Sequence, residues 1–75
     1  MKEKELLYKH LQSFAKNIKN ERLSKNLTQK QVANAIGVTI QSYQAYESGV
    51  ALPSAENLIK LVLFFDASLD DLFEI

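Results

Sequence analysis

The sequence contains no cysteine, which excludes a disulfide scaffold, thiol catalysis and thiolate metal ligands. Its single histidine, His10, argues against a metal site built from histidines, and we expect it on the surface or on the flank of a helix. One proline and two glycines leave no flexible linker, and there is no internal repeat or low-complexity segment. We therefore expect a single domain that holds no metal and no other cofactor.

The sequence also lacks long apolar runs and the groups that an active site needs. No run approaches the ~20 apolar residues of a membrane span, and the first residues lack the apolar centre of a signal peptide. The expected location is therefore the cytoplasm, without a membrane partner. No nucleophile–base pair, paired catalytic carboxylates or phosphate-binding glycine loop can be identified. An enzyme is not expected, and no small-molecule ligand is indicated.

The charges that are present are unevenly distributed. The 75 residues include 9 lysines and arginines and 9 acidic residues, which gives a formal net charge of zero. The segment up to Lys30 nevertheless carries a net charge of +5, and the segment from Gln31 onward carries a net charge of −5. This asymmetry indicates either an end of the molecule that faces a polyanion or a chance dipole on a solvated surface.

The remaining composition, 47% hydrophobic and 24% charged, is typical of a globular protein. No segment alternates with the two-residue period of a strand, whereas helical spacing and helix caps recur along the chain. The predicted N-caps are Thr28, Thr39, Ser54 and Ser68. Asn26 and Gly37 tolerate a left-handed backbone and are predicted to end the first two helices. Five helices are thus predicted, over about 5–25, 28–36, 39–48, 54–65 and 68–73.

The second and third predicted helices are separated only by Gly37 and Val38. So short a connection makes two helices cross steeply, as in a helix-turn-helix unit, which here spans residues 28–48. Ala33 supplies the small side chain where the backbones meet, and Gly37 supplies the turn. Tyr43 and Tyr46 on the third helix are predicted to face the core.

The opposite face of the third helix carries small or amide-bearing side chains and no acid. A helix exposed only to water usually carries Lys and Glu pairs. A glutamine amide instead donates and accepts at once, which matches adenine N6 and N7 in the major groove of DNA, and Ile40 and Ala45 suit a thymine methyl group. The alternative is that this face of the third helix is an ordinary polar surface that binds no partner.

These residues together resemble a known family. The motifs that carry the resemblance are Ile18-Lys19-x-x-Arg22, Leu27-Thr28-Gln29-x-x-Val32-Ala33, Gly37-Val38-Thr39, Tyr43, Tyr46-Glu47-Ser48-Gly49 and Pro53-Ser54. They are similar to the Cro/phage-repressor class of helix-turn-helix proteins, over about residues 14–72. The resemblance implies an all-α, five-helix, lambda-repressor-like fold whose second and third helices read DNA.

The resemblance also implies roles for single positions. The residues that match base-facing positions are Thr39, Ile40, Gln41, Gln44 and Ala45. Gln29 matches a position that holds a phosphate and supports the base-reading residues. Ser42 and Ser48 match positions near the DNA backbone. Arg22 and Glu47 match a structural ion pair that ties the first helix to the third.

Physical chemistry independently favours a phosphate at the start of the second helix. The first N–H groups of a helix lack intrahelical partners, and the helix dipole favours an anion there. Thr28 and Gln29 lie at this end, with Lys25 and Lys30 nearby in the sequence. The family pattern often has lysine or arginine after the third helix, but residues 48–52 contain none, so weaker phosphate binding is expected.

The C-terminal segment, residues 54–75, contains more apolar side chains than one helix face can bury against so small a core. We therefore predict a dimer surface there. Its expected residues are Leu63, Phe64, Leu69, Phe73 and Ile75. One alternative is that the core absorbs these side chains. Another is a partner surface on the N-terminal extension of the first helix, residues 1–12, through Leu6, Leu7 and Tyr8.

The sequence thus predicts a single helix-turn-helix domain over residues 1–75 that binds double-stranded DNA as a transcriptional regulator. A two-fold homodimer presents two reading helices about one DNA turn (~34 Å) apart, which suits a palindromic operator. A repressor is favoured because no activation or ligand domain fits in this length. The alternative function is a protein-interaction module, an adaptor or antitoxin-like partner, with weak or lost DNA binding. Zero net charge and the uncharged segment 48–52 favour that alternative.

Overall fold

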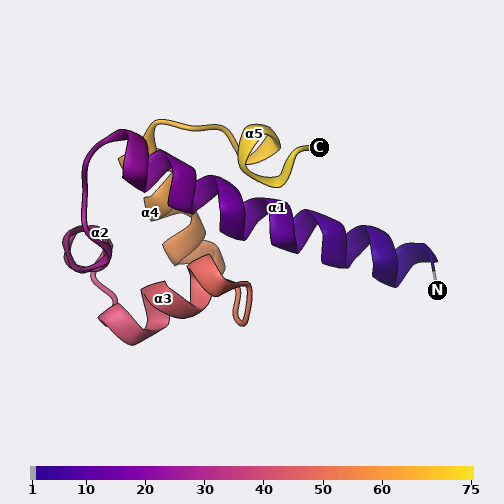
Figure 1. Cartoon of the computed structure of the whole chain (residues 1–75), viewed down its shortest axis with the longest axis horizontal. Helices are drawn as coiled ribbons and strands as arrows, with labels where there is room; N and C mark the ends of the chain where they lie inside the picture. The colour runs from indigo at the N-terminus through magenta and orange to yellow at the C-terminus, as the bar shows by residue number, and fades with distance from the viewer. Residues whose placement is uncertain (1) are drawn as a thin grey trace.

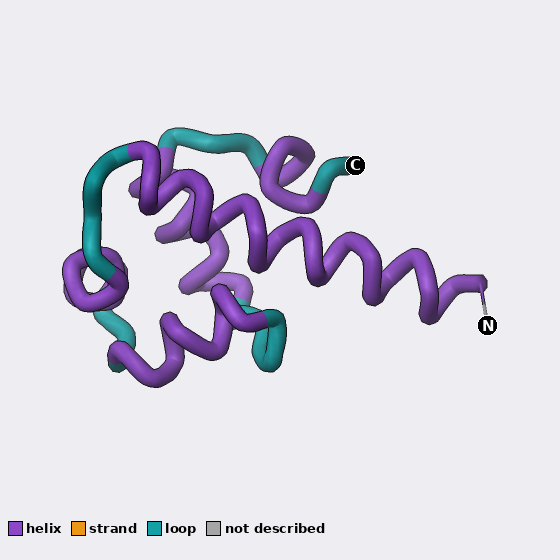
Figure 2. The backbone as a smooth tube through the Cα atoms, in the orientation of Figure 1, coloured by secondary structure: helices purple, strands orange, loops and turns teal. Residues whose placement is uncertain are grey.

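The computed structural model describes residues 2–75, and over these residues it consists of five helices and no strand. The helices are α1 (Lys2–Ser24), α2 (Gln29–Ile36), α3 (Ile40–Ser48), α4 (Ala55–Phe65) and α5 (Leu69–Phe73), shown in Figures 1 and 2. The predicted all-α, five-helix fold is confirmed. The one clear difference in bounds is that α1 begins at Lys2, earlier than the predicted start near residue 5.

Local capping chemistry determines where the helices begin and end. The Thr28 hydroxyl accepts from the Gln31 N–H at 3.1 Å, and the Gln31 side chain accepts from the Thr28 N–H at 2.8 Å, which completes a reciprocal capping box. Gly37 ends α2 with φ +75°, and Asn26 follows α1 with φ +57°. These are left-handed conformations, which Gly and Asn tolerate better than most residues. The predicted caps are therefore present.

The core lies where the five helices meet. Its largest fully buried side chains are Tyr43, Phe14, Phe65, Ile18, Leu61, Leu72 and Val32. Ala33 is also buried, and α2 and α3 pack against each other. In Figure 1, α2 and α3 lie together at one end of the molecule, beside the C-terminal half of α1.

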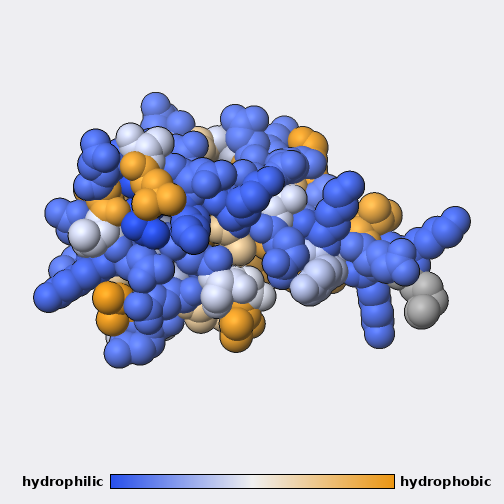
Figure 3. Space-filling model, in the orientation of Figure 1, coloured by the Kyte–Doolittle hydropathy of each residue, from blue (hydrophilic) through white to orange (hydrophobic). Residues whose placement is uncertain are grey.

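The N-terminal half of α1 extends beyond this core (Figure 1). Leu6, Leu7 and Tyr8 are exposed there, so the apolar spacing that predicts the helix continues past the residues it can bury. Figure 3 shows a small apolar group on this protruding part, on a face that is otherwise mostly hydrophilic. No helix among residues 2–75 combines the length and the apolar character needed to cross a bilayer.

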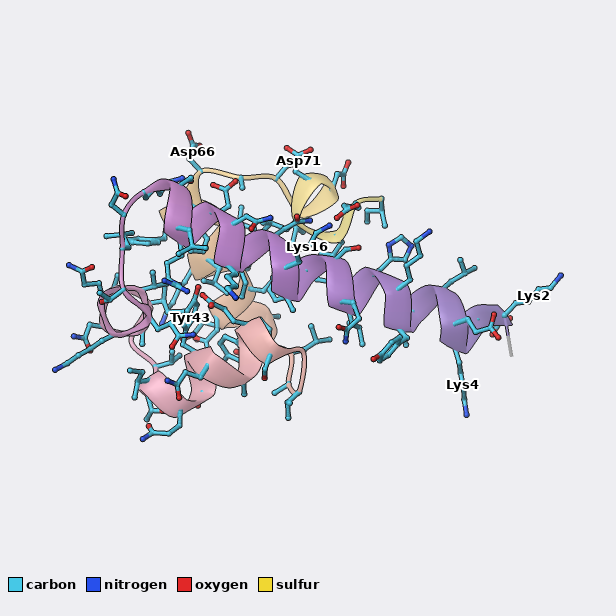
Figure 4. The ribbon with its side chains drawn as sticks, in the orientation of Figure 1. Lys2, Lys4, Lys16, Tyr43, Asp66 and Asp71 are labelled. Atoms are coloured by element: carbon cyan, nitrogen blue, oxygen red, sulfur yellow. The ribbon has the colours of Figure 1, made fainter. Side chains whose placement is uncertain are left out.

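The short helix α5 is held against α1 by side chains that the sequence does not identify. His10 Nδ1 donates to the Phe73 carbonyl at 2.9 Å, and Asn17 Nδ2 donates to the Leu72 carbonyl at 2.9 Å. The Lys16 ammonium lies 3.7 Å from the Glu74 carboxylate, and Figure 4 labels Lys16 on α1 close to α5. His10 is therefore a partly buried link between two helices, not a simple surface residue.

The same contact corrects one predicted dimer residue. The Phe73 ring stacks on Phe14 with a centroid separation of 4.7 Å and packs against the core. Phe73 is partly buried within the monomer, because α5 folds back onto α1. The prediction that Phe73 belongs to an exposed surface is wrong.

Candidate nucleic-acid interface

The outward face of α3 presents most of the residues predicted to face DNA bases. Thr39, Gln41 and Gln44 are exposed, and Ala45 is half-buried. Ile40 differs, because it is half-buried and packs against the core cluster. The prediction that all five side chains face outward toward bases therefore does not hold fully for Ile40, part of which packs against the core. Its position at the first turn of α3 turns part of its side chain inward.

A buried ion pair joins α1 to α3 behind this face. Arg22 Nε and Nη2 donate to the two Glu47 carboxylate oxygens at 2.7 and 3.0 Å, and Arg22 Nη1 donates to the Leu27 carbonyl at 2.9 Å. The side chains are only 10% and 4% exposed. This bidentate geometry fixes α3 relative to α1. The pair is thus part of the support for the face and is not on the face itself.

Two amides continue this network from the interior to the surface. Gln29 Nε2 donates to Glu47 Oε1 at 3.1 Å, and Gln44 Nε2 donates to Gln29 Oε1 at 3.1 Å. Gln29 is half-buried at the first position of α2, whereas Gln44 is exposed in the middle of α3. Gln29 therefore contacts a base-face residue directly, which agrees with the supporting role that the family resemblance implies.

The start of α2 has the features of an anion site. Thr28 and Gln31 use their own N–H groups in the capping box, so the unpartnered N–H groups of the first turn are those of Gln29 and Lys30. Lys30 is exposed beside them. Lys25, which the sequence places nearby, is otherwise engaged: its ammonium lies 2.9 Å from Glu21 and 5.7 Å from the Phe65 ring centroid. Lys25 therefore contributes less free charge to this site than predicted.

The hydroxyl groups of α3 differ in what they leave available. Thr39 accepts from the Ser42 N–H at 3.1 Å and donates to the Ser42 hydroxyl at 3.0 Å, so its methyl group is the part left for a base. The Ser42 hydroxyl hydrogen has no acceptor among the described residues. Ser48 donates to the Ala45 carbonyl at 3.1 Å, so its hydrogen is turned back onto the helix. Ser42 thus has a free hydroxyl donor, whereas the donor of Ser48 is used within the helix.

Lys19, on α1 beside the outward face of α3, is a positive residue to which the sequence motifs assigned no role. It lines a shallow groove between α1 and α3 together with Arg22, Gln29, Gln44 and Ser48. It lies about one helical turn before Arg22, so the i, i+3 spacing on α1 was the signal that could have found it. Its exposed ammonium adds the charge that residues 48–52 lack.

The surroundings of the ion pair shift the pKa values of two buried groups. Burial opposes the charge on Glu47, but hydrogen bonding, above all from Arg22, outweighs it and lowers the Glu47 pKa below its ordinary value. Burial raises the pKa of Tyr43 far above its ordinary range. The Tyr43 hydroxyl, labelled in Figure 4, has no hydrogen-bond partner within the described part of the chain. Glu47 is thus ionised and Tyr43 neutral at neutral pH.

Acidification is expected to destabilise the domain through Glu47. A carboxyl group whose pKa is lower in the folded chain stabilises the fold above its unfolded pKa, and the stabilisation disappears as the pH falls through the folded pKa. The free energy of unfolding should therefore decline below about pH 4.5, the ordinary pKa of Glu47. Urea unfolding at a series of pH values measures this. Glu47→Gln should make the free energy of unfolding depend less steeply on pH in this range. The control Glu56→Gln, which removes an exposed pair, should leave that dependence unchanged. If Glu47→Gln shows the same pH dependence as the wild-type chain, Glu47 is not the group responsible.

Comparison with known proteins is consistent with this geometry. A helix-turn-helix family profile matches residues 18–72. The transcriptional repressor RstR of cryptic phage CTXphi, from Vibrio cholerae serotype O1, is 45% identical over 53 residues, which cover 71% of this chain and 47% of the repressor. The uncharacterized HTH-type transcriptional regulator YqaE of Bacillus subtilis is 39% identical over 61 residues, which cover 81% of this chain and 53% of YqaE.

A third similar protein is the SPbeta prophage-derived uncharacterized HTH-type transcriptional regulator YonR of Bacillus subtilis, 36% identical over 61 residues that cover 81% of this chain and 56% of YonR. The chain spans about half the length of these curated relatives. No solved structure shows a significant match. The matched segment contains α2, α3, α4, the Arg22–Glu47 pair and most of α5. The chain belongs to the Cro/C1-type helix-turn-helix family of transcriptional regulators.

Proposed function

We propose that this chain binds double-stranded DNA in a sequence-specific manner as a transcriptional repressor, and that it occupies a palindromic operator as a homodimer. The observation that carries the proposal is the outward face of α3, where Gln41 and Gln44 present exposed amides and no acid. The buried Arg22–Glu47 pair holds this face rigidly to α1. Side chains of this kind on a fixed helix suit direct readout in the major groove.

Contacts to the DNA backbone are proposed for the start of α2 and the flank of α3. The free N–H groups of Gln29 and Lys30 point out of the first turn of α2, where the helix dipole favours a phosphate. Lys30 and Lys19 supply positive charge, and Ser42 supplies a hydroxyl donor. These contacts position the protein and make binding depend on salt, whereas α3 determines sequence preference.

The homodimer is proposed to form through an apolar patch on α4 and α5. Ile59, Leu63, Phe64, Leu69 and Ile75 remain exposed in the monomer, and Leu63 is 74% exposed. A groove lined only by apolar side chains runs along these two helices. Its lining is formed by Ala55, Leu58, Ile59, Val62, Leu63 and Leu69. Burial of such a patch against a second copy removes apolar surface from water.

Binding of the purified chain to DNA upstream of its own gene, compared with random duplex over a salt series, tests the proposal. A regulator should protect a preferred site with an affinity that falls as salt rises. Gln41→Ala should weaken binding to that site by about 5- to 150-fold while random duplex is bound as before. Lys30→Ala should instead weaken binding to every duplex and reduce the salt slope by about 1. Equal and feeble binding to both duplexes contradicts the proposal.

That negative result would favour an adaptor function, which has one specific observation behind it. The segment between α3 and α4 contains no lysine or arginine, and Val50 within it is 81% exposed. An exposed apolar side chain beside the recognition helix suits contact with a protein better than contact with a phosphate.

A further inference from the structure

The protruding part of α1 carries Lys4 and Tyr8 on the side of the helix that faces α3. We propose that Lys4, assisted by the Tyr8 hydroxyl, contacts the phosphate backbone of DNA beyond the base pairs that α3 reads. This contact replaces the phosphate contacts that residues 48–52, which contain no lysine or arginine, do not supply. The inference rests on the proposed DNA-binding function and adds a second contact surface to it.

The side of α1 that faces α3 is identified by contacts along the rest of the helix. Arg22 is bonded to Glu47 on α3, and Lys19 lines the groove between the two helices. Nearer the N-terminus, Gln12 Nε2 lies 2.9 Å from the point that a Cβ atom at Gly49 would occupy. Residues three or four positions apart share one side of a helix, so these contacts mark a single stripe along α1.

The same stripe continues from Gln12 to Tyr8 and then to Lys4, each four residues nearer the N-terminus. It is uncovered there, because both side chains are exposed and Tyr8 is 64% exposed. Figure 4 shows Lys4 directed to the side of α1 on which α3 lies. Lys4 therefore extends the line of positive charge that Lys19 begins beside the reading face.

Helix stability and ion pairing do not account for Lys4. A cation near the N-terminus opposes the helix dipole, which favours acidic residues there. In the described part of the chain its ammonium forms no ion pair, whereas Lys25 and Lys60 each pair with a glutamate four residues away. Glu3 and Glu5 are adjacent to Lys4 in the sequence but lie about 100° around the helix from it. The charge of Lys4 is therefore available to a partner.

The length of the extension suits a phosphate at the edge of the major groove. At 1.5 Å per residue, Lys4 lies about 12 Å beyond Gln12 along α1. The major groove is about 12 Å wide and about 8.5 Å deep, so phosphates flank an inserted helix at roughly the height of the elements behind it. In Figure 1 the N-terminal end of α1 lies beyond the C-terminal end of α3, at a similar level in the view. A DNA backbone that passes this end of α3 therefore comes within reach of Lys4.

The chemistry of the two side chains suits a phosphate. An ammonium and a phenolic hydroxyl both donate hydrogen bonds, and phosphate oxygens accept them without regard to base sequence. The helix-turn-helix profile begins at residue 18, so this part of α1 lies outside the matched segment. The contact therefore goes beyond what membership in the family assigns.

The experiment compares Lys4→Ala with Lys2→Ala on a duplex that the wild-type chain selects from a random library. The two variants lose the same charge from the same end of α1, but Figure 4 shows Lys2 directed away from the side of α3. Lys4→Ala should reduce the salt slope by about 0.9 for each bound subunit. Its disadvantage relative to wild type should thus shrink about threefold per subunit between about 50 and 200 mM salt. Lys2→Ala should keep the wild-type slope.

A chemical change in the DNA locates the contact. Each phosphate of the selected duplex is replaced in turn by an uncharged methylphosphonate, and Gln41→Ala and Gln44→Ala identify the base pairs that α3 reads. At least one replacement outside those base pairs should weaken wild-type binding by about two- to fivefold. The same replacement should not weaken binding of Lys4→Ala, and Tyr8→Phe should show an intermediate effect.

Several results overturn the inference. One is a wild-type salt slope in Lys4→Ala, and another is the lack of a sensitive phosphate outside the base pairs that α3 reads. If such a phosphate weakens wild type and Lys4→Ala alike, or if Lys2→Ala lowers the slope as much as Lys4→Ala does, Lys4 makes no defined contact. Absence of any preferred duplex overturns the proposed function and this inference together, whereas a preferred duplex with an unaltered slope in Lys4→Ala overturns the inference alone.

Discussion

Replacing Arg22 with methionine is expected to destabilise the domain by about 3–5 kcal/mol, because it leaves the Glu47 carboxylate buried without its cationic partner. The Glu47 side chain is 4% exposed, so water cannot substitute for the guanidinium. Domains of this size have a free energy of unfolding of roughly 4–11 kcal/mol, and the loss is a large part of it. A fall in melting temperature of at least about 12 °C is expected. Thermal and urea unfolding measure both quantities.

A second substitution shows whether the destabilisation comes from the unpaired Glu47 carboxylate or from the loss of Arg22 packing. When Arg22→Met is combined with Glu47→Met, most of the lost stability should return, because replacing both partners of a buried pair by apolar groups is often neutral. The matched surface variant is Lys60→Met, which breaks the exposed pair with Glu56 and should cost less than about 1 kcal/mol. If the single Arg22 variant is as stable as the Lys60 variant, the structural role of the pair is contradicted. Loss of DNA binding in Arg22→Met therefore says little about recognition.

Replacing Leu63 with aspartate is expected to separate the proposed dimer without unfolding the monomer. Leu63 is 74% exposed in the monomer, so a charge there is hydrated until a second copy covers it. Sedimentation should then show a monomer. Binding to a palindromic site should weaken by about 100-fold or more, because the second half-site is no longer bound with a high effective concentration. Binding to a single half-site should be unchanged.

The matched control for this experiment lies on the protruding part of α1. Leu6 is 57% exposed and lies away from α4, so Leu6→Asp should leave the dimer intact. If Leu6→Asp separates the dimer and Leu63→Asp does not, the subunit contact is on the α1 extension. A wild-type chain that sediments as a monomer at working concentration contradicts the proposed homodimer altogether.

Features governed by neighbours in the sequence could be predicted from it. The bounds of α2 follow from the Thr28–Gln31 capping box and the left-handed Gly37, which involve only nearby atoms. The buried Tyr43 and Tyr46 follow from helical periodicity in the same way. Periodicity does not say where the core ends, however. The apolar spacing that includes Leu7 continues past the part of α1 that other helices cover.

Features that depend on packing between distant segments could not be predicted. Phe73 resembles the other exposed apolar residues of the C-terminal segment until α5 is placed against Phe14. The link between Gln29 and Gln44 depends on side-chain orientations across two helices, which no spacing in the sequence encodes. The sequence thus identified which residues of α3 share a face. It could not show which of their side chains are held by hydrogen bonds and which rotate freely.

The attachment of α5 to α1 has a consequence for regulation. A five-residue helix does not persist alone, and His10 and Asn17 bind the carbonyl groups that its last turn leaves open. Leu69 and Ile75, part of the proposed subunit patch, lie on or directly after this helix, so their positions depend in part on those two bonds. In the proposed dimer, a change on α1 that breaks these bonds would therefore alter subunit pairing from outside the patch itself.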